Sequence, residues 1–254
     1  MRVTILGSGT SQGVPVITCE CRVCQSTNSK DKRLRTSAMV EWKNKVIVID
    51  AGPDFRQQML TNHVKKLDAI LLTHLHKDHI AGLDDVRAFN FKQKKPMDIF
   101  ADALTIQQVK NEFPYVFDGT DYPGIPQMNM HLIDDNPFVL DDIEIIPIPV
   151  LHYKLPVYGF RIDNFAYITD ASYIPESSMQ LLQNLEVLII NALRYEKHYS
   201  HFNVAEALEI VEKLKPKRAY FTHISHNLGL HEEVEASLPH HVFLAYDTLK
   251  IEID

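Results

Sequence analysis

Three histidines and one aspartate fall within a single short stretch, residues 73–79, with the sequence Thr-His-Leu-His-Lys-Asp-His. The four are His74, His76, Asp78 and His79. Imidazole nitrogen and carboxylate oxygen are ligand types that suit zinc, iron and manganese. Four such ligands exceed what one open catalytic metal usually takes from a single tight loop, so the stretch indicates two metal ions side by side. A surface loop rich in histidine by chance is disfavoured, because the apolar run at 67–72 predicts a buried strand leading into it.

Three more ligand-type residues follow predicted strands later in the chain. Strands are expected at 143–150, 165–169, 187–191 and 218–222. The residues that follow the first, second and fourth of these strands are His152, Asp170 and His223. Functional loops gather at strand ends in α/β folds, because loops there can converge. We therefore expect these three residues to join the first cluster.

The cysteines of the chain form a second candidate metal site. Cys19, Cys21 and Cys24 have the compact spacing Cys-x-Cys-x-x-Cys and are the only cysteines. In the reducing compartment that we expect, such a cluster indicates metal rather than a disulfide; three ordinary buried thiols are the alternative. Structural zinc takes four ligands, and His226 is the best candidate for the fourth. Because His226 lies three residues after His223, one can face each site.

The stretch at 73–79 resembles the His-x-His-x-Asp-His signature of the metallo-β-lactamase superfamily. That resemblance implies an α/β (α+β) fold, a four-layer αββα sandwich with two metal ions in a cleft at one edge of the paired sheets. It also implies two groups of three ligands and one bridging residue: His74, His76 and His152; Asp78, His79 and His223; and Asp170. Zinc, manganese and iron all suit this set.

A narrower resemblance, to the PhnP family of phosphoribosyl cyclic phosphodiesterases, spans nearly the whole chain. It rests on a glycine-rich loop at 7–15 that ends in Gln-Gly-Val-Pro, on the cysteine triad, and on His-Ile-Ser-His at 223–226. It implies a structural zinc ion, a homodimer, and a small cyclic phosphodiester as substrate, either phosphoribosyl 1,2-cyclic phosphate or a 2′,3′-cyclic nucleotide. The glycine-rich loop is either a plain turn or a segment whose backbone N–H groups face the substrate.

The expected chemistry is hydrolysis at phosphorus. Two metal ions about 3.5–4 Å apart can share a water whose pKa falls toward about 7, and the resulting hydroxide attacks in line. Asp78 and Asp170 take part as ligands, and His201 matches a position that contacts phosphate in PhnP-like enzymes. We expect His201 to be the general acid. We expect His198 to be a surface histidine, and Asp50, which ends a strand, to orient a ligand imidazole.

Four other functions share parts of this pattern. A tRNase Z-like RNA nuclease uses the same metal ligands but needs an RNA-gripping arm, and neither a long Gly/Pro-rich insertion nor a basic stripe is present in the sequence. A thioester hydrolase of the hydroxyacylglutathione type lacks the cysteine triad and the glycine-rich loop. A non-enzymatic, metal-stabilised binding domain would not need the full ligand set. A β-lactamase is disfavoured, because we find no export signal.

Length, composition and net charge limit the number of domains, the location and the partners that we expect. The chain has 254 residues, is 45% hydrophobic and 23% charged, and carries a formal net charge of -7. We expect one hydrolase domain over residues 1–254 with a cysteine-rich zinc loop at 18–36, in the cytoplasm and without a membrane span. The negative charge disfavours nucleic acid beyond nucleotides. We expect the basic run at 30–35 to be a solvated loop, and the aromatic stretch at 113–126 to be a lid or a dimer contact.

Overall fold

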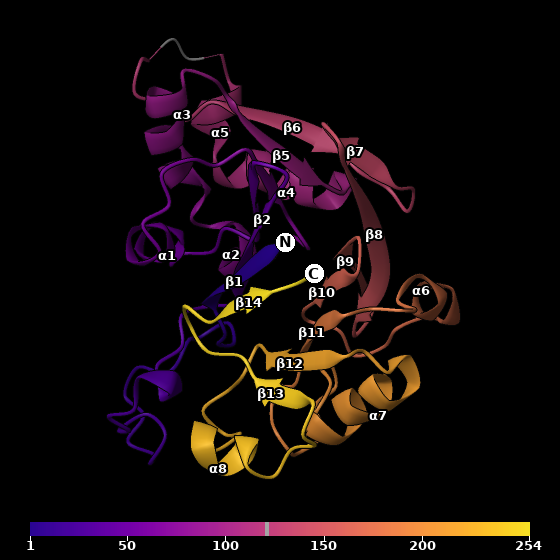
Figure 1. Cartoon of the computed structure of the whole chain (residues 1–254). Helices are drawn as coiled ribbons and strands as arrows, with labels where there is room; N and C mark the ends of the chain where they lie inside the picture. The colour runs from indigo at the N-terminus through magenta and orange to yellow at the C-terminus, as the bar shows by residue number, and fades with distance from the viewer. Residues whose placement is uncertain (120–121) are drawn as a thin grey trace.

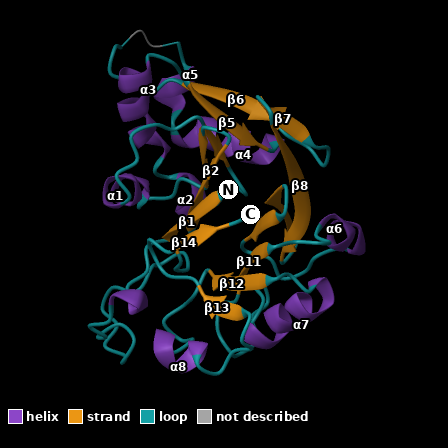
Figure 2. Ribbon diagram, in the orientation of Figure 1, coloured by secondary structure: helices purple, strands orange, loops and turns teal. Residues whose placement is uncertain are grey.

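Two β-sheets lie face to face between two outer layers of helices (Figures 1 and 2). The structure is a computed structural model, and it describes residues 1–119 and 122–254. Within these residues each sheet has seven strands, in the orders β14-β1-β2-β3-β4-β5-β6 and β13-β12-β11-β10-β9-β8-β7. The αββα sandwich predicted from the sequence is confirmed.

The first sheet is built mostly from the N-terminal half of the chain. Its strands are β1 (Arg2–Gly7), β2 (Ser37–Trp42), β3 (Lys45–Ile49), β4 (Ala69–Leu71), β5 (Met97–Ala101), β6 (Met128–Leu132) and the C-terminal β14 (Lys250–Glu252). Strands β3 to β6 run parallel, and β1 pairs antiparallel with β2 and β14. A two-residue turn joins β2 to β3, and both of its residues, Lys43 and Asn44, have positive φ. That geometry is typical of a hairpin whose turn matches the strand twist.

The second sheet comes from the C-terminal half. Its strands are β7 (Phe138–Leu140), β8 (Ile143–His152), β9 (Leu155–Ile162), β10 (Phe165–Ile168), β11 (Val187–Asn191), β12 (Arg218–Thr222) and β13 (Val242–Leu244). Strands β10 to β13 are parallel, and β10 and β11 are buried at every residue, which explains their apolar runs. Strand β8 is longer than the predicted 143–150, so His152 is its last residue and does not follow it.

The helices are short. They are α1 (Phe55–Thr61), α2 (Lys77–Ile80), α3 (Arg87–Gln93), α4 (Ala103–Glu112), α5 (Pro114–Phe117), α6 (Glu176–Leu181), α7 (Val204–Leu214) and α8 (His231–Glu235), with 3-10 turns at Ser29–Asp31 and Leu83–Val86. A capping box between Asn203 and Glu206 starts α7. Asp78 and His79 lie in α2, so the expectation of a loop over the whole of 73–79 is wrong at its end. Among the described residues, no helix has both the length and the apolar character needed to cross a membrane.

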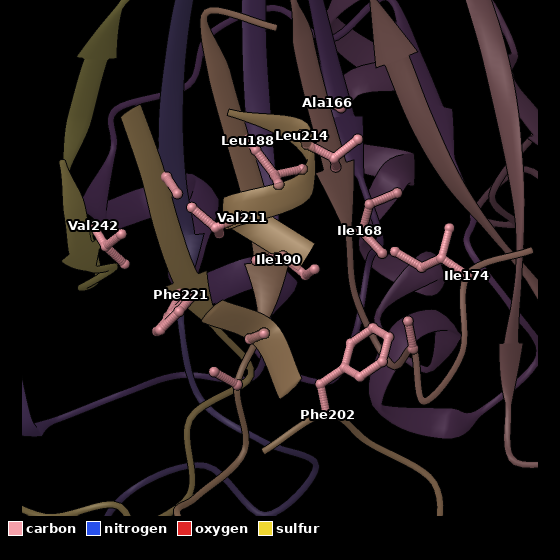
Figure 3. Close-up of a cluster of buried hydrophobic side chains, with 14 of the residues drawn as sticks. Ala166, Ile168, Ile174, Leu188, Ile190, Phe202, Val211, Leu214, Phe221 and Val242 are labelled. Carbon is pink, nitrogen blue, oxygen red and sulfur yellow. The ribbon is translucent and has the colours of Figure 1, made fainter. Parts of the chain in front are cut away.

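Three apolar cores separate the four layers. The central core packs side chains such as Ile5 and Ile47 of the first sheet against Phe160 and Phe165 of the second. A second core lies between the first sheet and helices α1, α3 and α4. The third lies between the second sheet and α7, where Val211 and Leu214 face Leu188 and Ile190 (Figure 3). Each such side chain contributes about 1.5–3 kcal/mol when fully buried, so the strand ends are held rigidly.

The basic run at 30–35 is not simply a solvated loop. The Arg33 guanidinium is 4% exposed and donates to Ser8 Oγ at 2.9 Å, with His231 Nδ1 at 3.1 Å. A buried cation requires such partners, which the sequence pattern alone does not reveal. In the aromatic stretch at 113–126, residues 114–117 form α5, and positions 120 and 121 lie outside the described residues, so its role as a lid or dimer contact stays a prediction.

Candidate metal centre

The predicted ligand residues converge from four strand ends. His74 and His76 follow β4, His152 ends β8, Asp170 follows β10 and His223 follows β12. Asp170 and His223 have positive φ, at 56° and 55°. That conformation is uncommon for residues other than glycine and clusters at functional sites. It turns each side chain out of its strand direction toward the shared centre.

The first group of ligand atoms comes from His74, His76 and His152, which lie within 4.8 Å of one another. Nε2 of His74 and Nδ1 of His76 are 3.0 Å apart. Nδ1 of His152 donates to the Ser200 carbonyl at 2.8 Å, which leaves Nε2 as the free nitrogen of that ring. Holding one ring nitrogen in a hydrogen bond is how proteins usually fix the tautomer of a metal-binding histidine.

The second group comes from Asp78, His79 and His223, also within 4.8 Å. Nε2 of His79 lies 3.1 Å from Asp78 Oδ2. Asp170 lies against the second group, with Oδ2 at 3.4 Å from His79 Nε2 and Oδ1 at 3.2 Å from His223 Nε2. Asp170 also forms a group with His74 and His79, so its position is the one expected of a bridging ligand.

The charges at this centre fit bound cations. Asp50 and Asp170 are buried and Asp78 is largely shielded. Burial raises the pKa of the Asp78 and Asp170 carboxyls, but the neighbouring histidines outweigh it and hold both pKa values below their usual range. Within the described residues, Nε2 of His79 and of His223 are buried without a hydrogen-bond partner. Clustered negative charge beside unpartnered ring nitrogens is the donor set that a divalent cation requires.

Asp50 supports the site from behind, as the sequence suggested. Its carboxylate accepts the His79 Nδ1–H at 2.6 Å and the Thr73 backbone N–H at 2.8 Å. The Thr73 hydroxyl donates to the same carboxylate. His79 Nε2 is thereby directed at the centre. Thr73 was not singled out in the sequence, although its place directly before His74 is the signal that could have found it.

The Asp50→Asn variant is expected to bind metal about 10–100-fold more weakly, because an amide cannot accept all of these donors and loses the charge that orients His79. Metal titration followed by elemental mass spectrometry measures this. Asp98→Asn is the matched control, since it removes an aspartate that contacts a histidine, His131, at 2.8 Å on the exposed surface. Equal metal affinity of Asp50→Asn and the native chain would refute the supporting role.

His201 lies at the edge of the centre and is almost fully buried. Its Nδ1 is 3.7 Å from Asp170 Oδ1 and, among the described residues, has no hydrogen-bond partner. Burial and the neighbouring His223 lower the pKa of His201 to about 3. His198 is not an isolated surface histidine, because its ring lies 5.2 Å from that of His201 and its Nδ1 is 3.2 Å from Ser200 Oγ.

The cysteine triad meets His226 across more than two hundred residues of sequence. Nδ1 of His226 is 3.2 Å from Cys19 Sγ and 3.5 Å from both Cys21 Sγ and Cys24 Sγ. A hydrogen bond from the Cys24 backbone N–H lowers the pKa of the Cys21 thiol to about 6, whereas burial raises that of Cys24 to about 11. Three sulfurs and one imidazole around one point match closed, tetrahedral zinc sites.

The glycine-rich loop at 7–15 joins these two sites, and whether its remaining N–H groups face a substrate stays a prediction. Most of its backbone N–H groups donate within the protein. Gly9 donates to the Leu34 carbonyl at 2.8 Å and Thr10 to the Ile224 carbonyl at 3.1 Å. The loop therefore ties the cysteine segment to the strand end that carries His223.

Comparisons with known proteins agree with this geometry. The family described as "Beta-lactamase superfamily domain" matches residues 45–224. The solved structure described as "Crystal Structure of a New Diphosphatase from the PhnP Family" is 42% identical and superposes with a TM-score of 0.93, covering 100% of this chain and 98% of that one.

Two curated relatives share part of their length with the chain. An octanoyltransferase of Porphyromonas gingivalis is 38% identical over 257 residues, which are 100% of this chain and 52% of the relative. A ribonuclease Z of Methanococcus maripaludis is 24% identical over 160 residues, which are 60% of this chain and 46% of the relative. The chain thus spans about half the length of these relatives.

Proposed function

Because the chain belongs to the beta-lactamase superfamily and is a PhnP-like, metal-dependent hydrolase within it, we propose that it is a phosphodiesterase with a pair of divalent metal ions, and that its substrate is a small cyclic phosphodiester. One observation carries the proposal. Asp170 reaches both groups of three ligands, since one of its oxygens lies within 4.8 Å of ring nitrogens of His74, from the first group, and of His79, from the second. That arrangement suits two ions sharing one carboxylate.

The assignment of ligands follows the geometry. His74, His76 and His152 would hold one ion, Asp78, His79 and His223 the other, and Asp170 both. Zinc or manganese, or else iron, suits these donors, and a structural zinc suits the cysteine cluster. When bound, such a pair supplies a water of lowered pKa and neutralises the charge of the phosphate.

Groups of the protein itself orient the ligands and supply a proton. Asp50 and the Ser200 carbonyl fix His79 and His152, so the ligands are oriented before a substrate arrives. Preorganisation of this kind lowers the cost of reaching the transition state. His201 is placed to donate a proton to the leaving oxygen. Burial and the neighbouring His223 lower the pKa of His201, whereas an anionic phosphate beside it favours the charged form, so the proton is held there when the phosphate is bound.

The His201→Ala variant is expected to lower turnover about 10²–10⁴-fold, the usual contribution of a general acid, while metal content stays unchanged. Initial rates and elemental analysis of the same preparation test this. His63→Ala, which removes a histidine of the α1–β4 connection, is the control. Loss of metal in step with activity would show that His201 is a ligand instead and would end its role as the acid.

A diphosphatase is the second candidate, favoured by the structure that is 42% identical over the whole chain. Both reactions attack phosphorus, but the leaving group differs. A panel of a cyclic phosphodiester, a diphosphate diester, an RNA precursor and an acyl thioester, followed by phosphorus NMR and thiol release, separates the alternatives. Ring opening to one monoester supports the proposal, two monoesters support the diphosphatase, and thioester cleavage alone overturns both.

The panel also addresses the remaining candidates. The acyl thioester tests the hydroxyacylglutathione type of hydrolase and any chemistry shared with the octanoyltransferase relative. The RNA precursor tests the nuclease. Turnover of none of these by protein with a full metal complement would favour the non-enzymatic binding domain. A cytoplasmic location and a homodimer remain part of the proposal, and sedimentation velocity of the full chain measures the second.

A further inference from the structure

A chain of aromatic rings leads from the metal-binding histidines to the surface. His201 stacks on His223 with ring centroids 4.7 Å apart, and His198 lies 5.2 Å from His201. Tyr199 stacks on His198 at 4.5 Å. Tyr153 meets Tyr199 edge to face at 5.6 Å. We call Tyr153, His198 and Tyr199 the aromatic rim. It adjoins the centre through the contact between His198 and His201.

The two tyrosines of the rim are exposed. Tyr199 has 72% of its surface accessible and Tyr153 has 54%. Single exposed aromatics are ordinary on protein surfaces, but two in contact beside a catalytic centre form an apolar platform. Such rings bind flat π-systems at low entropic cost, because each side chain has only two torsions to fix.

Tyr153 occupies a backbone position that favours another residue. It is the first residue of the two-residue turn between β8 and β9, and its φ is +58°. Hairpin turns of this length favour glycine or asparagine there, and a bulky side chain is strained. The ring is not in a core: it contacts Tyr199 and has Lys154 Nζ 5.3 Å from its centroid, so it is held at the surface beside the other rings.

The loop that carries Tyr199 is anchored close to the catalytic aspartate. The Leu193 backbone N–H donates to the Phe202 carbonyl at 3.0 Å, and the Phe202 N–H donates to the carbonyl of Ala171 at 2.8 Å. Ala171 directly follows Asp170, so the loop base and the metal centre share one rigid support. A ring at the tip of such a loop is presented at a fixed place relative to the reacting phosphate.

We infer that the aromatic rim stacks against the nucleobase of a nucleotide whose phosphate lies at the metal centre. The inference rests on the proposed function for the position of the phosphate, and it narrows the substrate class to nucleotides over base-free sugar phosphates. Every nucleobase has a π-face that stacks on tyrosine or histidine with little sequence preference. Purines, with the larger face, are expected to bind more tightly than pyrimidines.

Kinetics with two matched substrates test the inference. Tyr199→Ala is expected to raise KM for 2′,3′-cyclic AMP about tenfold, the order that the loss of one base stack produces, with kcat nearly unchanged. KM for the base-free phosphoribosyl 1,2-cyclic phosphate should not change, and Tyr199→Phe should retain nucleotide binding. Tyr195→Ala is the control, since Tyr195 is an exposed tyrosine of the same loop that lies outside the ring chain.

Tyr153→Gly gives a second test that misfolding cannot imitate. Glycine relieves the positive φ, so the melting temperature should hold or rise while KM for the nucleotide increases several-fold. A fall in both affinity and melting temperature would show that Tyr153 is structural and would count against the inference.

Binding without catalysis separates this inference from the proposed function. Calorimetry of AMP and of ribose 5-phosphate should show tighter binding of AMP, with the difference abolished by Tyr199→Ala. If no phosphate ester is hydrolysed but AMP still binds more tightly than ribose 5-phosphate, the proposed function fails and the inference that the rim binds a nucleobase is supported. If cyclic esters are hydrolysed but the two ligands bind alike, the rim inference is overturned. It is also overturned if Tyr199→Ala breaks a dimer in sedimentation without changing KM.

Discussion

Replacement of Asp170 by asparagine is expected to lower turnover by at least about 10³-fold and to release metal from the centre. The loss exceeds the 10–100-fold typical of a supporting residue, because Asp170 itself lies within reach of ligand atoms from both groups. The amide keeps the size of the side chain but removes the negative charge that would balance the two proposed cations. The amide also places a donor NH₂ group beside Nε2 of His79 or of His223. These nitrogens require an acceptor or a metal ion, so a second donor there is unfavourable. Steady-state rates and elemental analysis measure both effects.

The control for this variant is matched in backbone conformation. Asp163 has φ of 54°, close to the 56° of Asp170, but it is exposed in the turn between β9 and β10. Asparagine tolerates positive φ as well as aspartate does, so neither change disturbs the backbone. Asp163→Asn should keep full activity and full metal content. An Asp170→Asn protein that keeps both as well would contradict the shared-carboxylate site.

The His226→Ala variant is expected to lose the structural metal ion and to lower the free energy of unfolding by more than about 4 kcal/mol. It removes the imidazole on which all three cysteine sulfurs converge. The loss should reach the catalytic centre, because the Ile224 N–H donates to the Ser8 carbonyl and the glycine-rich loop connects both segments. Chemical denaturation, metal content and turnover report the three effects.

Thiol chemistry gives an independent measurement of the same variant. Without metal, the Cys21 thiol, whose pKa is lowered to about 6, is largely ionised at pH 7. Alkylation should therefore be slow in the metal-loaded native chain and fast after chelation, and it should also be fast in His226→Ala, where the thiols are no longer shielded by metal. His240→Ala, at an exposed position, is the control. Rapid alkylation of the metal-loaded native chain would argue that the thiols are ordinary free cysteines.

The positions of the strands could be predicted well because burial on both faces leaves continuous apolar runs. Residues 187–191 and 218–222 are strands as expected, and the helix after Asn203 begins at a capping box that is readable in the sequence. The same patterns could not show that β8 continues to His152, or that α2 already begins at Lys77. Ends of elements depend on turn geometry and neighbouring strands more than on local preference.

Contacts between residues far apart in the sequence were a second feature that the sequence could not predict. Arg33 lies in a run of basic residues and reads as solvated, yet it is enclosed by Ser8 and His231. Likewise, no local pattern showed that the Gly9 and Thr10 amides of the glycine-rich loop donate to the carbonyls of Leu34 and Ile224. In each case the partner lies far away in the sequence, where no local pattern records it.

The sequence by itself determined which ligand types are present and that they stand at strand ends, since residue type and hydrophobic pattern are local properties. Only the tertiary structure decided which atoms meet. Asp50 reaches His79, His226 reaches Cys19, and Tyr153 reaches Tyr199. The contacts of Asp50 and Tyr153 lie within one sheet and depend on the order of its strands, whereas that of His226 joins the two sheets and depends on how they pack face to face. That packing is set by the summed burial of side chains along the whole chain, which no single motif contains.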